Sequence, residues 1–332
     1  MLFGRSQQVK VGNFFSDSKI ITSGVPQGSV LGPILFIFFI NDITQTAVPP
    51  TIPKLYADDL KVYSSTINDR DGKKFQETLN KITDWAETWQ LPISKEKSKW
   101  LLITNKNKKL SHAEVKFELA GVELPEVKDV LDLGINFTSR LNFSKHIAIT
   151  IAKAKQRLFL LKKSFKSRNT ASLILGFKTY VLPILDYCSQ VWNPQDYKDM
   201  RRIESVQRMF TKRLAGYNCL NYPQRLERAG LCSLELRRLH ADLSLCYNIL
   251  HGNLDTEISN FFQLDTSSKT RGHTWKLKIY VARLDLRLHY FSYRIINAWN
   301  ALSQSTVDSS SIASFKCNLK TENLNSFLSM LD

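Results

Sequence analysis

The chain has 332 residues, of which 43% are hydrophobic and 11% aromatic, a composition that excludes a disordered protein and leaves room for two or three domains. Its net charge of +16 and pI near 9.6 favour a polyanionic partner, either nucleic acid or an acidic membrane surface. Much of the charge is concentrated, because residues 140–185 include ten lysines and arginines and no acid.

The cysteines and the apolar runs indicate in which cellular compartment the protein is expected. The five cysteines are scattered and form no CxxC or CCHC spacing, which is typical of reduced thiols and not of zinc ligands or disulfides. The first residues show no charged segment followed by an apolar core, and the most apolar run, residues 30–40, is too short to span a bilayer. We therefore expect an intracellular protein of the nucleus, the cytoplasm or both, and not a secreted one.

Residues 1–23 predict a β-hairpin with a polar connection. Short runs of strand-forming residues flank the turn residues Gly12 and Asn13. Neither a capped helix nor a full strand precedes them, so we expect the chain to begin inside a domain.

A loop rich in glycine and proline follows at residues 23–33. Gly24 and Gly28 let the backbone approach a ligand closely, and Pro26 stiffens the turn between them. The amide side chain of Gln27, close to a helix N-terminus, suits contact with a nucleotide or a backbone phosphate. Taken alone, such a loop is more often without a ligand.

The next segment, residues 34–43, predicts a helix. Ser29 can cap it, and Pro33 is tolerated in its first turn. The segment is apolar nearly all round, so we expect the helix to be buried.

Two adjacent acids, Asp58 and Asp59, lie in the segment LYADDLKVY, residues 55–63. Alternating apolar residues on both sides predict a strand, a tight turn and a second strand, with both acids at the tip. Neighbouring carboxylates repel each other, so a cation commonly lies beside such a pair. For an isolated pair a solvated turn is the commoner explanation. Whether this pair binds a metal therefore has to be judged from the surrounding motifs.

The order and spacing of these segments are informative. Val25–Ser29 (VPQGS), a helix ending in Asn41 and Asp42, and Tyr56–Asp59 (YADD) resemble the central palm motifs of reverse transcriptases. The residues of these motifs are most similar to those of non-LTR retrotransposons of the LINE type, jockey-like elements in particular.

The resemblance implies an RNA-directed DNA polymerase that uses an RNA template, a DNA primer and deoxynucleoside triphosphates. It also implies two Mg²⁺ (or Mn²⁺) ions, with Asp58 as a metal ligand and Asp59 as its less direct companion. On the same basis a nucleotide and template contact is expected from the preceding loop, at Gly24, Pro26, Gln27 and Gly28.

Residues 72–90 predict an amphipathic helix. The apolar residues recur at helical spacing, at Phe75, Leu79, Ile82, Trp85 and Trp89. We expect both tryptophans to be core anchors that cover the palm sheet, a more common use than base stacking.

Residues 91–103 resemble the family's next palm motif, with a strand predicted at 100–103. Lys97 aligns with a lysine that approaches the nucleotide triphosphate, where a cation can protonate or neutralise the leaving pyrophosphate. Ser94 stands where the family usually has asparagine. An ordinary solvated lysine explains Lys97 equally well.

Residues 129–137 (DVLDLGINF) resemble the family's hairpin that grips the primer strand. Leu133 and Gly134 match the family pattern, whereas Leu131 and Asp132 replace its aromatic lead-in.

From Ser144 the pattern becomes helical. One apolar stripe is expected to be buried, at Ile147, Ile151, Ala154, Leu158 and Leu161. Cations cover much of the remainder, at Lys145, Lys153, Lys155, Arg157, Lys162 and Lys163. A basic amphipathic helix can lie on a membrane, but after a palm it is better interpreted as a thumb that contacts the nucleic-acid backbone.

Residues 170–332 continue as helices and resemble the region that follows the polymerase in jockey-like elements. Ser233 is placed to cap a helix that ends near Gly252. We expect Trp192, Trp299 and His273 to serve packing, because no acid or cysteine lies at ligand spacing from them.

The predicted fold is α+β: a partial palm with an antiparallel sheet and packed helices, then an all-helical thumb and carboxy-terminal region. The predicted domains are the partial palm at 1–138, the basic thumb at 139–215 and the helical region at 216–332.

The resemblance also implies that one essential aspartate and the fingers precede the glycine-rich loop. Only Asp17 lies there, outside any motif, and it is not assigned as a ligand. We therefore expect little polymerase activity from this chain alone. The alternatives are a catalytically dead remnant that binds nucleic acid through its basic thumb and, less favoured by the palm motifs, a membrane-surface protein.

Overall fold

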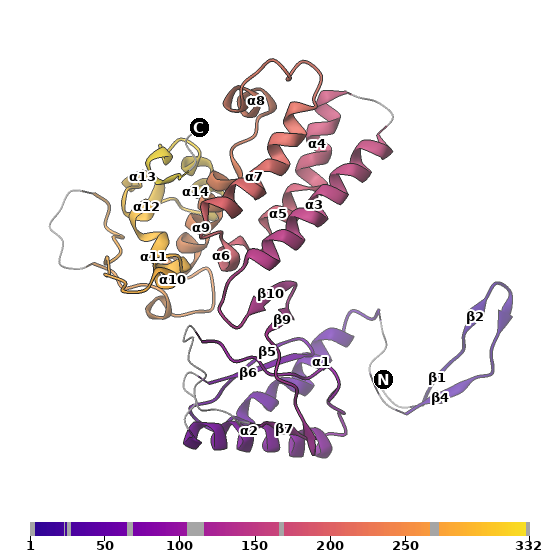
Figure 1. Ribbon diagram of the computed structural model, residues 1–332. Coiled ribbons are helices and arrows are strands. Elements are labelled where there is room, and N and C mark those ends of the chain that lie inside the picture. Colours follow the sequence, from indigo (N-terminus) through magenta and orange to yellow (C-terminus); the bar gives the residue numbers. More distant parts are fainter. Residues whose placement is uncertain are drawn as a thin grey trace. The chain divides into compact units, whose positions relative to one another are not determined.

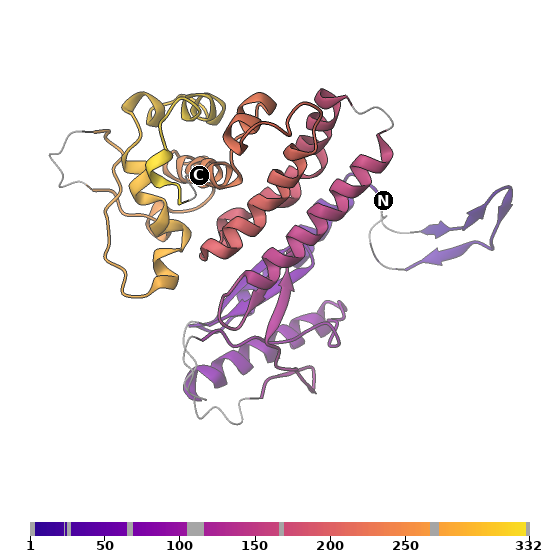
Figure 2. The same ribbon diagram turned by 45° about the horizontal axis from the view of Figure 1, so that its top comes forward.

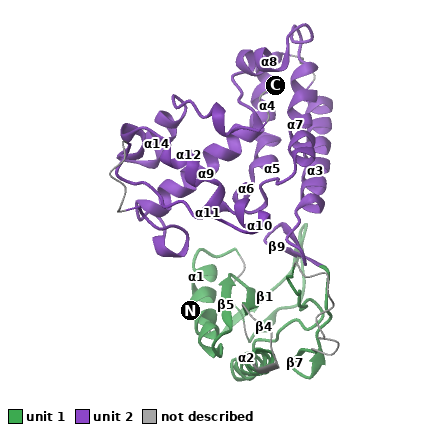
Figure 3. Ribbon diagram, turned by 60° about the vertical axis from the view of Figure 1, so that its left-hand side comes forward, with its two compact units in different colours: residues 1–128 green, residues 129–332 purple. Residues whose placement is uncertain are grey.

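The computed structural model describes residues 4–22, 24, 28–64, 69–104, 116–165, 169–265 and 272–329. The chain forms two compact units, Met1–Lys128 and Asp129–Asp332, which Figure 3 shows in different colours. The first unit combines small antiparallel sheets with helices, and the second begins with a β-hairpin and continues as helices. The predicted α+β class is confirmed. Among the described residues no helix is long and apolar enough to cross a membrane.

The first unit begins with two nested pairs of antiparallel strands. β1 (Arg5–Gln7) pairs with β4 (Lys19–Ile21), and between them β2 (Lys10–Val11) pairs with β3 (Phe14–Phe15). Gly12 in the turn has φ = 60°, a left-handed value that glycine adopts without strain. The long hairpin predicted for the N-terminus is therefore confirmed (Figures 1 and 2).

A helix, a hairpin and a second helix form the centre of this unit. Their bounds are α1 (Gly32–Ile40), the 3-10 helix η1 (Asn41–Thr46), β5 (Ile52–Tyr56), β6 (Asp59–Tyr63) and α2 (Asp69–Thr88). The core between them is made by Ile40, Ile43, Ile82, Trp85 and Ala86, with Leu55, Leu60 and Val62 of the hairpin packed against it. Alternate strand residues reach this core because successive side chains of a strand point to opposite faces.

Another small core lies along α2. Phe117, Leu119 and Leu124 pack with Leu79 of α2, around the hairpin of β7 (Glu118–Leu119) and β8 (Val122–Glu123). Trp100 packs beside them but joins only an isolated bridge to Glu126. The strand predicted at 100–103 is therefore wrong, since residues 101–104 adopt no regular structure.

The expectation that α1 is buried is also wrong. Ile40 is buried at the end of the helix, but Ile37 is 54% and Phe38 77% exposed. Phe39 packs edge-on against Trp89, whose ring is itself 47% exposed, so only Trp85 of the two tryptophans is a core anchor. The described part of the unit covers one end of α1 and leaves an apolar face without a neighbour.

The second unit begins with the hairpin of β9 (Asp129–Asp132) and β10 (Ile135–Thr138), as predicted for residues 129–137. The helices that follow are α3 (Ser144–Ser164), α4 (Thr170–Tyr180), α5 (Leu182–Asp186), α6 (Ser189–Trp192) and α7 (Tyr197–Lys212). All members of the predicted α3 stripe are buried. They pack against α4, α5 and α7, where Phe177 stacks on Phe210 with 4.1 Å between ring centroids.

The remaining helices complete the second unit; most of them build a further core, while the first contributes Ala229 to the core around α3. They are α8 (Tyr222–Ala229), α9 (Leu234–Leu250), α10 (Asp285–Leu288), α11 (Phe291–Arg294), α12 (Ile296–Asn300), α13 (Gln304–Val307) and α14 (Ile312–Leu319), with 3-10 turns at Ile258–Asn260 and Asn325–Phe327. Ser233 caps α9 as predicted, because its hydroxyl accepts a hydrogen bond from the Leu236 N–H at 3.2 Å. Trp192 and Trp299 are fully buried, and His273 lies 2.9 Å from the Trp299 carbonyl, which confirms their packing role.

The predicted domain boundaries at 138 and 215 remain predictions. One core cluster of the second unit runs from Ile135 to Leu234, and the other from Leu243 to Leu324. Both include residues of α9, so this helix joins the two cores.

Candidate functional site

The acidic pair lies at the tip of the β5–β6 hairpin. Tyr56 pairs with Asp59, so Ala57 and Asp58 form a two-residue turn between the strands. Ala57 has φ = 51°, the left-handed conformation that tight hairpin turns require. Both aspartates are exposed, while Leu55 and Leu60 anchor the strands in the core. The predicted strand, turn and strand with the acids at the tip are confirmed.

Asp58 and Asp59 are the carboxylates that the family resemblance singles out as metal ligands, and both belong to the described part of the first unit. Within the described residues no group of three or more His, Cys, Asp or Glu side chains is placed to hold a metal ion. Two adjacent exposed carboxylates suit a hard divalent cation, because such ions prefer oxygen ligands and tolerate water at the remaining positions. The pair therefore fits part of a metal site.

A nearby acid, Asp42, has a different role that the sequence did not reveal. Its Oδ1 accepts a hydrogen bond of 3.0 Å from Trp85 Nε1. Asp42 thereby fixes α2 against the end of α1, and the expected core position of Trp85 has a polar reason as well as an apolar one.

The glycine-rich loop is described in part. Pro26 and Gln27 lie outside the described residues, and Gly24 and Gly28 each have φ = 81°. Nothing lies within 4 Å of a Cβ placed at either glycine, so the left-handed backbone and not crowding favours glycine there. The Ser29 hydroxyl accepts a hydrogen bond of 3.0 Å from the Gly32 N–H at the start of α1, but the N-cap position is Leu31, so Ser29 is not the N-cap that was predicted.

Lys97 lies in an exposed turn, residues 95–97. Lys95 in the same turn donates a hydrogen bond of 2.9 Å to the Ala120 carbonyl between β7 and β8. Among the described contacts, none joins Lys97 to Asp58 or Asp59, so its predicted role stays a prediction.

The predicted cations on α3 differ in their surroundings. Lys153, Lys155, Arg157 and Lys163 are exposed. Lys145 forms an ion pair of 2.7 Å with Asp129 at the start of β9, and is therefore partly neutralised. Burial lowers the pKa of Lys162, and the positive charge of Arg213 lowers it further. The exposed subset is the better match to the predicted backbone-binding role.

The β9–β10 hairpin is held on the helical unit by polar contacts. The Tyr187 hydroxyl donates a hydrogen bond of 3.0 Å to the Leu133 carbonyl. The Asn136 N–H donates one of 3.3 Å to His146 Nδ1 on α3. Leu133 and Gly134 have φ of 44° and 82°, the conformation of a two-residue hairpin turn. Among the described contacts, the hairpin resembling the primer grip is thus braced by α3 and by Tyr187.

The chain is similar to known reverse transcriptases. The family described as "Reverse transcriptase (RNA-dependent DNA polymerase)" matches residues 6–137. A probable RNA-directed DNA polymerase from transposon BS of Drosophila melanogaster is 31% identical over 213 residues, which is 61% of this chain and 23% of that protein. The RNA-directed DNA polymerase from mobile element jockey of the same fly is 28% identical over 224 residues, 64% of this chain and 24% of that protein.

A more distant relative belongs to another element. It is the retrovirus-related Pol polyprotein from type-1 retrotransposable element R1 2 of Nasonia vitripennis, 25% identical over 177 residues, 51% of this chain and 43% of that protein. No solved structure matches the chain.

The matches to the two fly polymerases span about a quarter of those proteins (23% and 24% of their length). The family match runs through the acidic hairpin to the β9–β10 hairpin, and the similarity to the fly elements extends beyond it. Residues 6–137 thus match the reverse transcriptase family, and the chain is similar to the polymerases of jockey-like non-LTR retrotransposons.

Proposed function

We propose that the protein containing this chain copies RNA into DNA from a primer, and that Asp58 and Asp59 provide part of its metal site. The observation that carries the proposal is the hairpin in which both acids stand exposed on a tightly paired two-strand support. Such a support fixes carboxylate positions better than a free loop does.

The family uses divalent ions, and Mg²⁺ or Mn²⁺ would be held by Asp58, with Asp59 as the less direct ligand. Bound there, two ions would activate the attacking hydroxyl and stabilise the transferred phosphoryl group. The residues of this chain contribute position and charge. Gly24, Pro26, Gln27 and Gly28 would contact the incoming nucleotide and template, and Lys97 would stand close to the leaving pyrophosphate.

We further propose that α3 contacts the sugar–phosphate backbone of the primer–template. Its apolar stripe is fixed in the core, so the opposite face presents Lys153, Lys155, Arg157 and Lys163 on a rigid support. Phosphate contacts of this kind supply affinity without reading sequence.

The direct test is primer extension on an RNA template with Mg²⁺ or Mn²⁺. It is carried out with the 332-residue chain and with the longest protein that the same reading frame encodes. We expect template-directed synthesis by the longer protein and little by the 332-residue chain, because within its described residues no third acid joins Asp58 and Asp59 in a metal-binding group. No synthesis by the longer protein in either metal would contradict the polymerase proposal.

A second candidate function is nucleic-acid binding without synthesis. The observation that favours it is the contrast between α3, whose apolar stripe is buried under an exposed basic face, and an acidic hairpin that no further described acid joins in a metal-binding group. In that case both proteins would bind primer–template and neither would extend it.

A further inference from the structure

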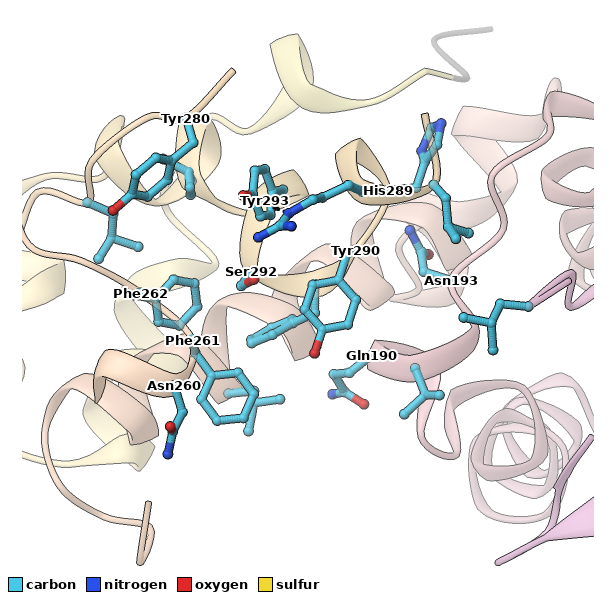
Figure 4. A pocket seen from close by; sticks show the side chains of 18 of the residues that line it. Gln190, Asn193, Asn260, Phe261, Phe262, Tyr280, His289, Tyr290, Ser292 and Tyr293 are labelled. Carbon is cyan, nitrogen blue, oxygen red and sulfur yellow. Dashed lines mark hydrogen bonds between the residues drawn. The ribbon is translucent and has the colours of Figure 1, made fainter. Parts of the chain in front are cut away.

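A pocket of about 1190 Å³ opens in the second unit, and of the motifs that the sequence singled out it touches the β9–β10 hairpin at Phe137 (Figure 4). Its wall is built from residues 137–143, residues 190–195, Leu245, residues 259–263 and residues 277–296. Part of its floor is the core around α9 and α12, to which Leu245 and Ile296 belong.

Aromatic rings dominate the wall. Figure 4 shows the rings of Phe261, Phe262 and Tyr290 around the middle of the pocket, with Tyr280 and Tyr293 beyond them. Phe262 is buried and packs edge-on against Phe291, with 5.7 Å between ring centroids. Tyr290, in contrast, is 56% exposed. An exposed ring beside fixed rings is suited to stacking on a flat ligand.

Amide side chains lie among the rings. Two of them already have hydrogen-bond partners within the protein. Asn193 Oδ1 accepts a hydrogen bond of 2.9 Å from Arg238 Nε, and Gln263 accepts one from the Tyr280 hydroxyl. The side-chain amides of Gln190 and Asn260 have no hydrogen-bond partner among the described residues and line the pocket. Each offers a donor and an acceptor, the combination that the edge of a nucleobase also presents.

The charge of the pocket favours an anion. Lys278, Arg287 and His289 line it, and no Asp or Glu does among the described residues. Arg287 donates a hydrogen bond of 2.8 Å to the Tyr293 hydroxyl, and its guanidinium lies 5.0 Å from the centroid of that ring. From Gly272 to Arg294 the chain has five lysines and arginines against one acid. Cations beside the rings can accompany the phosphates of a bound strand.

The pocket walls are fixed to each other by a buried ion pair. Arg294 donates hydrogen bonds of 2.8 Å and 3.0 Å to the two carboxylate oxygens of Asp242. The same guanidinium also donates hydrogen bonds of 2.9 Å to the Gln190 carbonyl and of 2.9 Å to the His289 carbonyl. Arg294 thus links two of the wall segments, so little ordering is needed when a ligand binds.

We propose that this pocket binds unpaired bases of single-stranded nucleic acid, with Tyr290 as the stacking residue. Bases in a duplex are already stacked on their neighbours, whereas unpaired bases can insert between aromatic side chains. The proposal rests on the proposed function only in that the chain acts on nucleic acid, and it needs neither Asp58 nor the cations of α3.

The binding test uses fluorescence anisotropy with labelled oligonucleotides of about 12 nucleotides, a length within the usual footprint of single-strand binding folds. Single-stranded RNA, single-stranded DNA and a duplex of the same sequence are compared. We expect Tyr290→Ala to weaken binding of at least one single strand about tenfold and to leave duplex binding within about twofold. Tyr290→Phe, which keeps the ring, should bind like the unchanged protein.

The matched control is Tyr180→Ala, which removes a tyrosine of similar exposure, 53%, on α4 outside the pocket. Circular dichroism of each variant establishes that it is folded. Unchanged single-strand affinity in Tyr290→Ala, or an equal loss in Tyr180→Ala, would overturn the proposal. The RNA and DNA arms show which kind of strand the pocket accepts.

Photo-crosslinking supplies a readout of position. An oligonucleotide carrying 4-thiouridine, or its deoxy counterpart, is irradiated with the protein and the linked peptides are identified by mass spectrometry. We expect links within residues 259–263 or 278–296, absent in Tyr290→Ala and retained when Lys153, Lys155 and Arg157 are all changed to Ala. Links to α3 alone would contradict the pocket while leaving the backbone-contact proposal intact.

Discussion

The helices α1 and α3 are both rich in apolar residues, yet their apolar side chains are buried to different extents. In α3 the apolar side chains form a stripe, and every member of it is buried, from Ala154 at 0% to Ile151 at 7% exposed. In α1 the apolar residues surround the helix, and most of them face solvent in the described structure, Phe38 at 77%. A stripe specifies which side of a helix packs, whereas an apolar circumference specifies only that neighbours are needed on several sides.

Similar substitutions should therefore have different consequences in the two helices. Changes to the α3 stripe should alter stability, changes to its outer face should alter binding, and changes to the outer face of α1 should alter neither by much.

Leu158→Ala should be strongly destabilising. Its side chain is 2% exposed, so truncation leaves a cavity and should lower the free energy of unfolding by about 2–5 kcal/mol. Leu160→Ala is the matched control on the same helix, since Leu160 is 46% exposed and should cost under about 0.5 kcal/mol. Urea unfolding followed by circular dichroism measures both. Equal losses would mean that the stripe has been assigned to the wrong face.

Changing Lys153, Lys155 and Arg157 together to Ala should weaken nucleic-acid binding. Each phosphate contact contributes nearly one unit to the slope of log affinity against log salt, so the slope should fall by about two to three. Titration of duplex binding over a range of salt concentrations measures it.

The charge-matched control changes the exposed residues Lys198, Lys316 and Lys320 to Ala. If this control reduced the slope as much as the α3 variant, binding would follow net charge and not the face of α3.

The buried face of α3 should also make stability depend on pH. Burial lowers the pKa of His146 below its ordinary value of 6.5, and the charge of Lys153 lowers it further. The unfolded chain then binds a proton at a pH where the folded chain does not, so stability is complete above about 6.5 and falls as the pH drops toward the lowered pKa. Protonation would also remove the acceptor at Nδ1 for the Asn136 N–H.

Unfolding at pH values of about 7.5 and 5.5 measures this effect. Burial lowers the pKa values of His240 and His273 as well, so His146→Gln should remove only part of the difference. Stability that is equal or greater at the lower pH would contradict the assignment.

The smallest effect is expected for Phe38→Ser on α1. Its ring is 77% exposed, so unfolding should change by less than about 0.5 kcal/mol, while less apolar surface should reduce self-association. Ile40→Ser is the control, because Ile40 is 5% exposed and belongs to the core. Light scattering and urea unfolding report the two properties separately. A large loss of stability in Phe38→Ser would show that α1 is covered after all.

Local pattern and the family resemblance were sufficient to predict the acidic hairpin, the β9–β10 hairpin and the α3 stripe. In each, a period of two or of 3.6 residues and a turn residue such as Gly134 define the element without distant contacts. The strand at 100–103 was wrong because strand-forming residues need a partner, and Trp100 has only an isolated bridge.

Other features depend on side chains that are remote in sequence. The pairing of Lys145 with Asp129, the bond of Trp85 to Asp42 and the pocket beside Tyr290 join segments 16, 43 and more than 90 residues apart. No local pattern marks such contacts. A basic and aromatic run at residues 272–294 was the available signal for the pocket, and composition alone does not distinguish it from a packed helical region.

The most direct test of the central claim separates catalysis from binding in one sample. Asp58→Asn keeps the shape of the side chain and removes the charge, in the longest protein of the reading frame, and single-nucleotide incorporation is measured beside the affinity for primer–template. We predict that incorporation falls by orders of magnitude, less in Asp59→Asn and not at all in the off-motif control Asp17→Asn, with affinity unchanged in all three. Unchanged incorporation in Asp58→Asn, or a loss matched by lost affinity, would contradict the claim that this hairpin holds the metal.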